Sequence, residues 1–523
     1  MLNTNKFRTV LLGCAAAALL GACTGADGVA SPGVGAFVPP PAPPPAPPPP
    51  PPPGPPPPTG GPAADCPAGF ANVGLIASQR ICQLPGTITG NLVVPKREGT
   101  IYAVSGRTQV GTDRGNNPLS PIPGSQEGIL TIEPGVTIFG SSGGDYLLVN
   151  RGSQIFAEGE ANDPIVMTSR QSVLGQTNEN SNGQWGGFVI NGRAPTSDGC
   201  PGGVTPPNAS CEAQVEGSNA FFGGNSPLES SGRVRYLRVM YSGFEIAPDN
   251  ELNGITLAGV GSGTVFDHVQ VHNSSDDGIE IFGGTVNLRY IVLTGNDDDG
   301  FDTDSGWQGA AQYGIAYQRT QGGDYGLETS GKGGVDTFTS RPFYVNWTVV
   351  NRASTSRDAV VHNSGHIGIM YNSVIAHTVQ GTERTCLQLN GAATRDRANG
   401  FGTSGPRWNS VLFSCPSGNF RGAGGVTNAE VQTILNAGQN NVLNHVSTLT
   451  NGFINGPNEA AAVATPFPTA NAATGAAGTA TVPQMLDSVL AFIEPADYVG
   501  AVRDANDTWY KGWTCGLPGE PAC

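Results

Sequence analysis

An internal repeat constrains the fold of this chain more than any other feature of its sequence. Two segments align without a gap at an offset of 22 residues: 266–284 (FDHVQVHNSSDDGIEIFGG) and 288–306 (LRYIVLTGNDDDGFDTDSG). A weaker copy begins at Val234, and a later one with a few inserted residues runs from Tyr313 through Glu328. Short strands that recur with a period in the low twenties are typical of a β-solenoid, in which each coil buries its inward side chains against its neighbours.

Short apolar runs extend this pattern over much of the chain. Runs such as 130–132, 137–139, 146–149 and 165–167 alternate with turns rich in Gly, Asn and Ser. Alternation of period two over a few residues predicts strands. The chain has 76 Gly and only 13% charged residues, which is unlike a helical enzyme. We therefore expect an all-β fold.

The repeat stacks the carboxylates of one coil over those of the next. The stacked pairs are Asp276 with Asp298, Asp277 with Asp299, and Glu280 with Asp302, and Asp304 adds to the cluster. Coils stack at ~4.8 Å, so these like charges repel one another unless something compensates them. Ca²⁺ would do so, because it takes about six to eight oxygen ligands, and the absence of His and Cys from these positions disfavours zinc or copper. The alternative is that the Asp side chains only satisfy backbone groups of the turns.

Several segments carry a resemblance to a known family. They are the two acidic repeats, 130–138 (LTIEPGVTI), 185–192 (WGGFVING), 251–261 (ELNGITLAGVG) and the closing stretch 504–515. Over most of residues 85–520 the pattern resembles the right-handed parallel β-helix of the pectate-lyase-like superfamily. It is similar in more detail to a group of bacterial surface β-helix proteins often found near TonB-dependent transporters. The resemblance implies a right-handed parallel β-helix and a TonB-dependent transporter as a partner.

The same resemblance raises the alternative of a calcium-dependent polysaccharide lyase. Some β-helix lyases hold Ca²⁺ with an acidic turn like residues 298–302 (DDGFD), and a nearby Lys or Arg removes the proton beside a uronate carboxylate. Lys332 and Arg289 are the candidate bases here, with Arg319 also in reach, but no spacing identifies any of them as the base. The sequence therefore favours a binding protein over an enzyme.

The amino terminus predicts export and lipidation. Lys6 and Arg8 precede an apolar run over 10–22 that is too short to span a bilayer. Residues 20–23 (LGAC) resemble the lipobox of bacterial lipoproteins, which implies cleavage before Cys23, acylation of that residue and an outer-membrane location. Residues 39–58 are nearly pure proline and predict an extended spacer.

The remaining cysteines fit an oxidising compartment. Cys14 lies in the expected signal peptide, and eight others fall into close neighbour pairs: Cys66/Cys82, Cys200/Cys211, Cys386/Cys415 and Cys515/Cys523. An even number at local spacing in an exported chain predicts disulfides, with neighbour pairing preferred although the spacing does not prove it.

These observations predict five regions. They are a signal peptide (1–22), a lipidated Cys with a proline-rich linker (23–62), an N-terminal cap (63–125), the parallel β-helix (126–425) and a C-terminal cap with helices and a low-complexity loop (426–523). The formal net charge of −15, without a basic cluster, excludes nucleic acid as a partner. We expect an outer-membrane surface lipoprotein that binds a polymeric or nutrient ligand or a partner protein. A calcium-dependent polysaccharide lyase or hydrolase and a structural or adhesive envelope protein are the alternatives.

Overall fold

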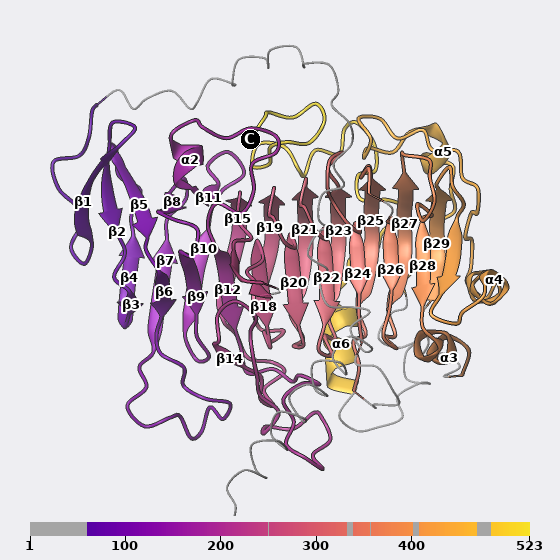
Figure 1. Cartoon of the computed structure of the whole chain (residues 1–523), viewed down its shortest axis with the longest axis horizontal. Coiled ribbons are helices and arrows are strands. Elements are labelled where there is room, and N and C mark those ends of the chain that lie inside the picture. Colours follow the sequence, from indigo (N-terminus) through magenta and orange to yellow (C-terminus); the bar gives the residue numbers. More distant parts are fainter. Residues whose placement is uncertain (1–59, 249, 332–337, 356, 401–406, 468–482) are drawn as a thin grey trace, which may run out of the picture.

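The computed structural model describes residues 60–248, 250–331, 338–355, 357–400, 407–467 and 483–523. Two long sheets run the length of this part of the chain, one of 15 strands and one of 11 strands (Figure 1). Beyond the antiparallel pair β1–β2, their strands are paired in parallel, and the chain passes from one sheet to the other along its length. The all-β parallel β-helix expected from the repeat is confirmed.

The strands of the two sheets have the following bounds. The 15-stranded sheet contains β1 (Ala71–Ile76), β2 (Gln79–Gln83), β4 (Gly90–Val94), β5 (Thr100–Val104), β7 (Gly128–Ile132), β8 (Thr137–Gly140), β10 (Gln154–Glu158), β11 (Ile165–Ser169), β15 (Gly232–Met240), β19 (Val265–His272), β21 (Asn287–Thr294), β23 (Ala310–Tyr317), β25 (Phe343–Asn351), β27 (Ile369–His377) and β29 (Arg407–Ser414). The 11-stranded sheet contains β3 (Thr87–Ile88), β6 (Arg107–Val110), β9 (Tyr146–Val149), β12 (Gly187–Asn191), β18 (Ile255–Ala258), β20 (Ile279–Phe282), β22 (Phe301–Asp304), β24 (Leu327–Thr329), β26 (Val360–His362), β28 (Leu387–Asn390) and β30 (Phe420–Ala423).

Smaller elements surround these sheets. Two hairpins project from the coils: β13 (Ala213–Gln214) with β14 (Phe221–Phe222), and β16 (Glu245–Ala247) with β17 (Asn250–Glu251). The helices are α2 (Arg170–Val173), α3 (Ala392–Gly400), α4 (Asn428–Asn436), α5 (Pro457–Ala460) and α6 (Pro483–Phe492). No helix in the described ranges is long and apolar enough to cross a membrane.

The 22-residue offset sets the register between coils. Ile279 pairs with Phe301 across β20 and β22, and both side chains are fully buried in the core between the sheets. Because side chains alternate along a strand, the next residue on each strand, Glu280 and Asp302, points to the outer face. The repeat therefore stacks apolar residues inside and carboxylates outside.

The long strands of the 15-stranded sheet bend at one residue in each coil. His268, Tyr290 and Tyr313 each adopt a positive φ, at 53°, 58° and 59°. A bend at the same place in successive coils brings their rings together, with centroids 4.4 Å apart between His268 and Tyr290 and 5.0 Å apart between Tyr290 and Tyr313. The result is an aromatic ladder along the outside of this sheet.

The C-terminal segment, residues 493–523, crosses the outside of the same sheet (Figure 1, yellow). Gln312 donates to the carbonyl of Glu494 at 2.8 Å, and Gln270 donates to the carbonyl of Cys515 at 2.6 Å. Trp513 is fully buried, and its ring lies 5.6 Å from that of His268. This segment, called the strap below, covers the aromatic ladder of His268, Tyr290 and Tyr313.

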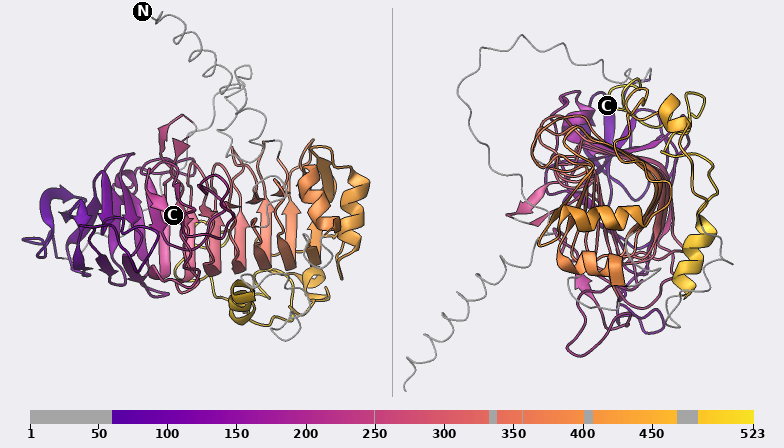
Figure 2. Two further views of the ribbon diagram at one scale, coloured as in Figure 1. Left: turned by 90° about the horizontal axis from the view of Figure 1, so that it is seen from below. Right: turned by 90° about the vertical axis from the view of Figure 1, so that its right-hand side faces the viewer.

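Two expectations about the ends need correction. The sheets begin before residue 126, because β2 pairs in parallel with β5 and β4 pairs with β7, so the segment 63–125 supplies coils. The region 426–523, expected to cap the stack with helices, contains α4 and α6, but of these two only α4 lies at the end of the stack (Figure 2). Val489 of α6 packs against Phe343 and Val345 on the side of the 15-stranded sheet. An apolar helix face predicts burial without specifying the surface that buries it.

All four neighbour pairs of cysteines form disulfides. They are Cys66–Cys82, Cys200–Cys211, Cys386–Cys415 and Cys515–Cys523. Each one closes a local loop of at most 29 residues in separation, so the disulfides fix loops and caps rather than linking distant coils.

Candidate functional site

The candidate site is an acidic face on three successive coils of the 11-stranded sheet. Glu280 on β20 pairs with Asp302 on β22, which pairs with Glu328 on β24. Further along the sheet the same position is occupied by Val361 and then Gln388. The acidic character is therefore confined to the coils that carry the repeat.

The turns that precede these strands add four more carboxylates. The Asp277 carboxylate accepts a hydrogen bond from the backbone N–H of Asp299 at 3.0 Å, and Asp299 accepts one from the N–H of Tyr325 at 2.8 Å. These two side chains connect each turn to the next coil, as the turn-based alternative expects. Asp276 and Asp298 occupy the preceding position in the same turns, and each is more than nine-tenths buried.

Three groups of carboxylates are close enough to share a cation. In each group one oxygen from each residue lies within 4.8 Å of the others, which is the separation that two ligands across a Ca²⁺ ion can span. The groups are Asp276/Asp277/Asp298, Asp277/Glu280/Asp302 and Asp298/Asp299/Asp324. All three members of the second group are buried, so its charges are poorly solvated.

Burial makes the ionised form of these carboxyl groups unfavourable. The pKa of Asp302 is raised well above its ordinary value by desolvation and then by the nearby Glu328 and Asp304. Desolvation and Asp302 raise the pKa of Glu280 in the same way. Desolvation and Asp324 raise the pKa of Glu328 to about 7. Such a set must either keep protons or hold a cation.

Asp302 is a member of this set whose hydrogen bonding is incomplete. Its side chain is only 6% exposed, and its Oδ1 atom has no hydrogen-bond partner among the described residues. By contrast, Glu280 accepts a hydrogen bond from the Asn253 amide at 2.6 Å. Buried carboxylate oxygens are normally satisfied, so the Asp302 oxygen points to a donor or a cation beside it.

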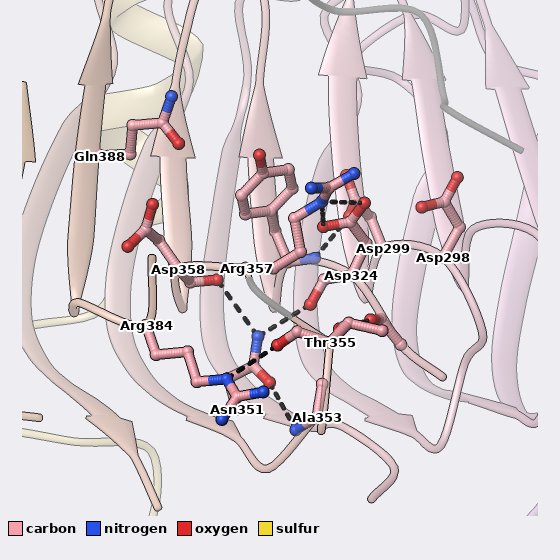
Figure 3. Close-up of polar contacts among 12 residues, drawn as sticks. Asp298, Asp299, Asp324, Asn351, Ala353, Thr355, Arg357, Asp358, Arg384 and Gln388 are labelled. Carbon is pink, nitrogen blue, oxygen red and sulfur yellow. Dashed lines mark hydrogen bonds and ion pairs between the residues drawn. The ribbon is translucent and has the colours of Figure 1, made fainter. Parts of the chain in front are cut away.

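One coil further along, an arginine compensates a member of the third group. The guanidinium of Arg357 donates to the Asp324 carboxylate at 2.8 Å, as Figure 3 shows. The Asp358 carboxylate is fully buried and accepts from Arg421 at 2.6 Å and from the Thr385 N–H at 2.7 Å. Asp358 is thus satisfied within the protein, whereas the triad of Asp277, Glu280 and Asp302 has no arginine among its hydrogen-bond or ion-pair partners in the described residues.

Comparison with known proteins agrees with this architecture. A family model described as a pectate-lyase-like β-helix domain matches residues 121–407, which is more than half of the chain. The chain belongs to this family. No curated protein and no solved structure gave a significant match to this pectate-lyase-like β-helix protein.

The structure brings together six of the seven carboxylates expected to bind metal in this β-helix protein. Asp304 belongs to none of the three groups and instead lines a cavity beside Glu280. Asp324 joins the third group although sequence reasoning missed it. The inserted residues before β24 shift it out of the 22-residue register, so only the strand order could have identified it.

Of the two candidate bases, Lys332 and Arg289, only Arg289 lies within the described residues. Arg289 lies on β21 of the other sheet, where its guanidinium donates to the Glu494 carboxylate at 2.6 Å. It therefore lies away from the acidic face and is not placed to act as a base there. The repeat located Arg289 within its coil but did not indicate which sheet would carry it. Lys332 lies outside the described residues, as does Cys23.

Proposed function

We propose that this β-helix is a non-catalytic surface protein that binds a polymeric or nutrient ligand on its acidic face. Ca²⁺ held by Asp277, Glu280 and Asp302 stabilises that face in the proposal. The observation that carries it is the buried triad, in which the unsatisfied Oδ1 of Asp302 lies beside two further carboxylates. The bound cation offsets most of the negative charge of the triad and leaves coordination positions for ligand oxygens.

The location of the protein forms part of the same proposal. The sequence around Cys23 supports a lipid anchor at the outer membrane, and the proline-rich segment 39–58 supports a spacer that carries the β-helix away from the bilayer. A TonB-dependent transporter is the proposed partner, which would receive the captured ligand. The resemblance of the repeat segments to surface β-helix proteins found near TonB-dependent transporters supports this partner.

Binding is preferred to lyase chemistry because of the basic groups near the acidic face. A lyase needs a base that is free to take a proton from the substrate. Of the candidate bases within the described residues, Arg319 is ion-paired with Asp297 and Arg289 lies on the other sheet. Neither side chain is arranged to accept a proton beside the triad.

A single set of incubations tests binding against catalysis. The full-length protein with calcium is mixed with neutral, amino-substituted and uronate polysaccharides, and its mobility is followed by affinity electrophoresis. Absorbance of unsaturated sugar products is recorded in parallel. We expect retardation by at least one polymer without new absorbance. Appearance of unsaturated products from a uronate polymer would contradict the proposal and identify a lyase.

A further inference from the structure

The turn that leads into the acidic strands occurs in three successive coils, and its first copy is neutral. β18, β20 and β22 pair in register, so the segments 253–256 (NGIT), 277–280 (DGIE) and 299–302 (DGFD) lie over one another. The first copy has Asn253 and Thr256 where the two later copies have carboxylates. The row of stacked carboxylates therefore begins at Glu280, beside two neutral side chains.

Asn253 contacts the next coil differently from the aspartates with which it aligns. Asp277 and Asp299 each accept a backbone N–H from the following coil, at 3.0 and 2.8 Å. The side-chain amide of Asn253 instead donates to Oε2 of Glu280 at 2.6 Å and to Oγ1 of Thr256 at 3.2 Å. Its Oδ1 atom has no hydrogen-bond partner among the described residues, so the two bonds of Nδ2 set the orientation of the amide.

The backbone holds Asn253 in place on both sides. The preceding residue, Leu252, is buried in an apolar cluster with Leu148 and Val189. The N–H of the following residue, Gly254, donates to the carbonyl of Asp277 at 2.9 Å. The Asn253 side chain itself is only 3% exposed, so it has little freedom to turn away from Glu280.

The contact with Glu280 requires a neutral amide. An ionised aspartate has acceptor oxygens but no donor, so at this position it would add a charge and leave Oε2 of Glu280 without its bond. Burial raises the pKa of Glu280, and the hydrogen bond from Asn253 acts in the opposite direction because it stabilises the ionised form. The ionised form is the one that can bind a cation.

We propose that Asn253 is a positioning residue of the cation site and acts through Glu280. One oxygen each of Asp277, Glu280 and Asp302 lies within 4.8 Å of the others, and a shared cation requires that this arrangement is kept. The amide holds Glu280 by one oxygen and leaves its other oxygen for the cation, so the ligand is ordered before the ion arrives. The inference rests on the proposed function, because it requires that the triad holds calcium.

Calcium titration by calorimetry on the full-length protein tests this role. Asn253→Leu removes the donor and keeps a similar volume, and it should weaken calcium binding by about 10–100-fold, as is typical when a group that orients a metal ligand is lost. Asn253→Ala should give the same loss and provides the test if the leucine variant does not fold.

Asn150 supplies the matched control. It is also buried, and its side-chain amide donates to the carbonyl of Gly111 at 2.9 Å, outside the acidic coils. Asn150→Leu and Asn150→Ala remove a buried amide without touching Glu280. They should therefore change calcium affinity by no more than about twofold.

The number of water molecules on the bound ion gives a readout that a general loss of packing would not change. Europium(III) takes oxygen ligands as calcium does, and its luminescence decay in H₂O and in D₂O reports how many water molecules it binds. We expect about one more bound water in the Asn253 variants than in the wild type and the Asn150 variants, because water replaces a displaced Glu280 oxygen.

The outcomes separate this inference from the calcium site itself. No calcium binding by the wild type would refute the calcium site and the positioning role together. Calcium binding that both Asn253 variants retain within about twofold would overturn only the positioning role. An unchanged number of bound waters, or equal weakening by the Asn253 and Asn150 variants, would also overturn that role while retaining the calcium site.

Discussion

At Asp302, the repeat places a carboxylate close to others of the same charge. Its backbone neighbours are strand residues of an ordinary coil, yet its carboxylate is buried between Glu280 and Glu328 on the adjacent coils. Repeating one acidic side chain along a sheet places like charges about one strand spacing apart. The folded protein must offset this repulsion with protons or with a cation.

The proton alternative gives a pH dependence that can be measured. The pKa of Glu328 is raised to about 7, so the folded state keeps a proton there that the unfolded state releases above about pH 4.5. Without calcium, this group should therefore destabilise the fold as the pH rises from about 4.5 to 7. Glu328→Gln should remove that loss and make the variant more stable than the wild type at pH 8, by about 1–3 kcal/mol.

Chemical denaturation with a chelator at pH 5 and pH 8 checks this effect. Comparing the two proteins cancels the contribution of buried His272 and His366, whose pKa values are lowered to about 3 and which change stability in the opposite direction in both proteins. The remaining difference reports Glu328 together with its effect on the pKa of Asp302. The same difference between variant and wild type at both pH values would show that Glu328 does not hold the proton.

Sequence reasoning at the residue scale succeeded where the repeat has no insertions. The unbroken 22-residue offset placed Asp276, Asp277 and Glu280 over their partners. It could not place Asp324 or Arg357, because insertions break the period after residue 306 and Arg357 compensates charge from a later coil. The cavity beside Glu280 was also not foreseen, because part of its lining comes from the insertion between β12 and β15, which lies outside the repeat.

At the scale of elements, the strap over the 15-stranded sheet is the feature that sequence patterns described least. Strand periods identified most coils, but periodicity gives no information about which element packs on which surface. The strap has no regular period, and its contacts are made by backbone carbonyls such as that of Trp513, which accepts from Arg238 at 2.9 Å. Residues as far apart in sequence as Arg238 and Trp513 come together only in the folded chain.

The strap should contribute strongly to stability through Trp513. Its indole is fully buried against Tyr236 and His268, and removing it leaves a large cavity. Trp513→Ala should lower the free energy of unfolding by about 3–5 kcal/mol, measured by denaturant titration. Asn506→Ala, an exposed position in the same strap, is the control and should change it by no more than about 0.5 kcal/mol. Equal effects of both substitutions would mean that the strap does not pack as described.

At the scale of the whole molecule, a long β-helix presents one continuous face. The core runs through the stack from Cys82 near the first coils to Leu435 of α4 near the last, so each coil is supported by its neighbours. The acidic coils and the cavity occupy one stretch of the 11-stranded sheet, while the strap covers the opposite sheet. This division keeps the strap off the sheet that carries the acidic coils.

The proposed anchor is tested on the whole protein by one substitution. Cys23→Ser removes the thiol that would be acylated, so the protein should move from the membrane fraction to the soluble fraction after cell disruption. Cys14→Ser lies in the expected signal peptide and should leave the distribution unchanged. Membrane association that survives Cys23→Ser would refute the lipid anchor.

The most direct test of the account is calcium titration by calorimetry on the full-length protein. The wild type and the control Asp163→Asn, which alters an exposed ion pair with Lys96, should bind calcium saturably. Asp302→Asn keeps the shape of the side chain but removes its charge, and it should weaken binding by about tenfold or more. No binding heat in the wild type, or binding that Asp302→Asn leaves unchanged, would contradict a cation held by Asp277, Glu280 and Asp302.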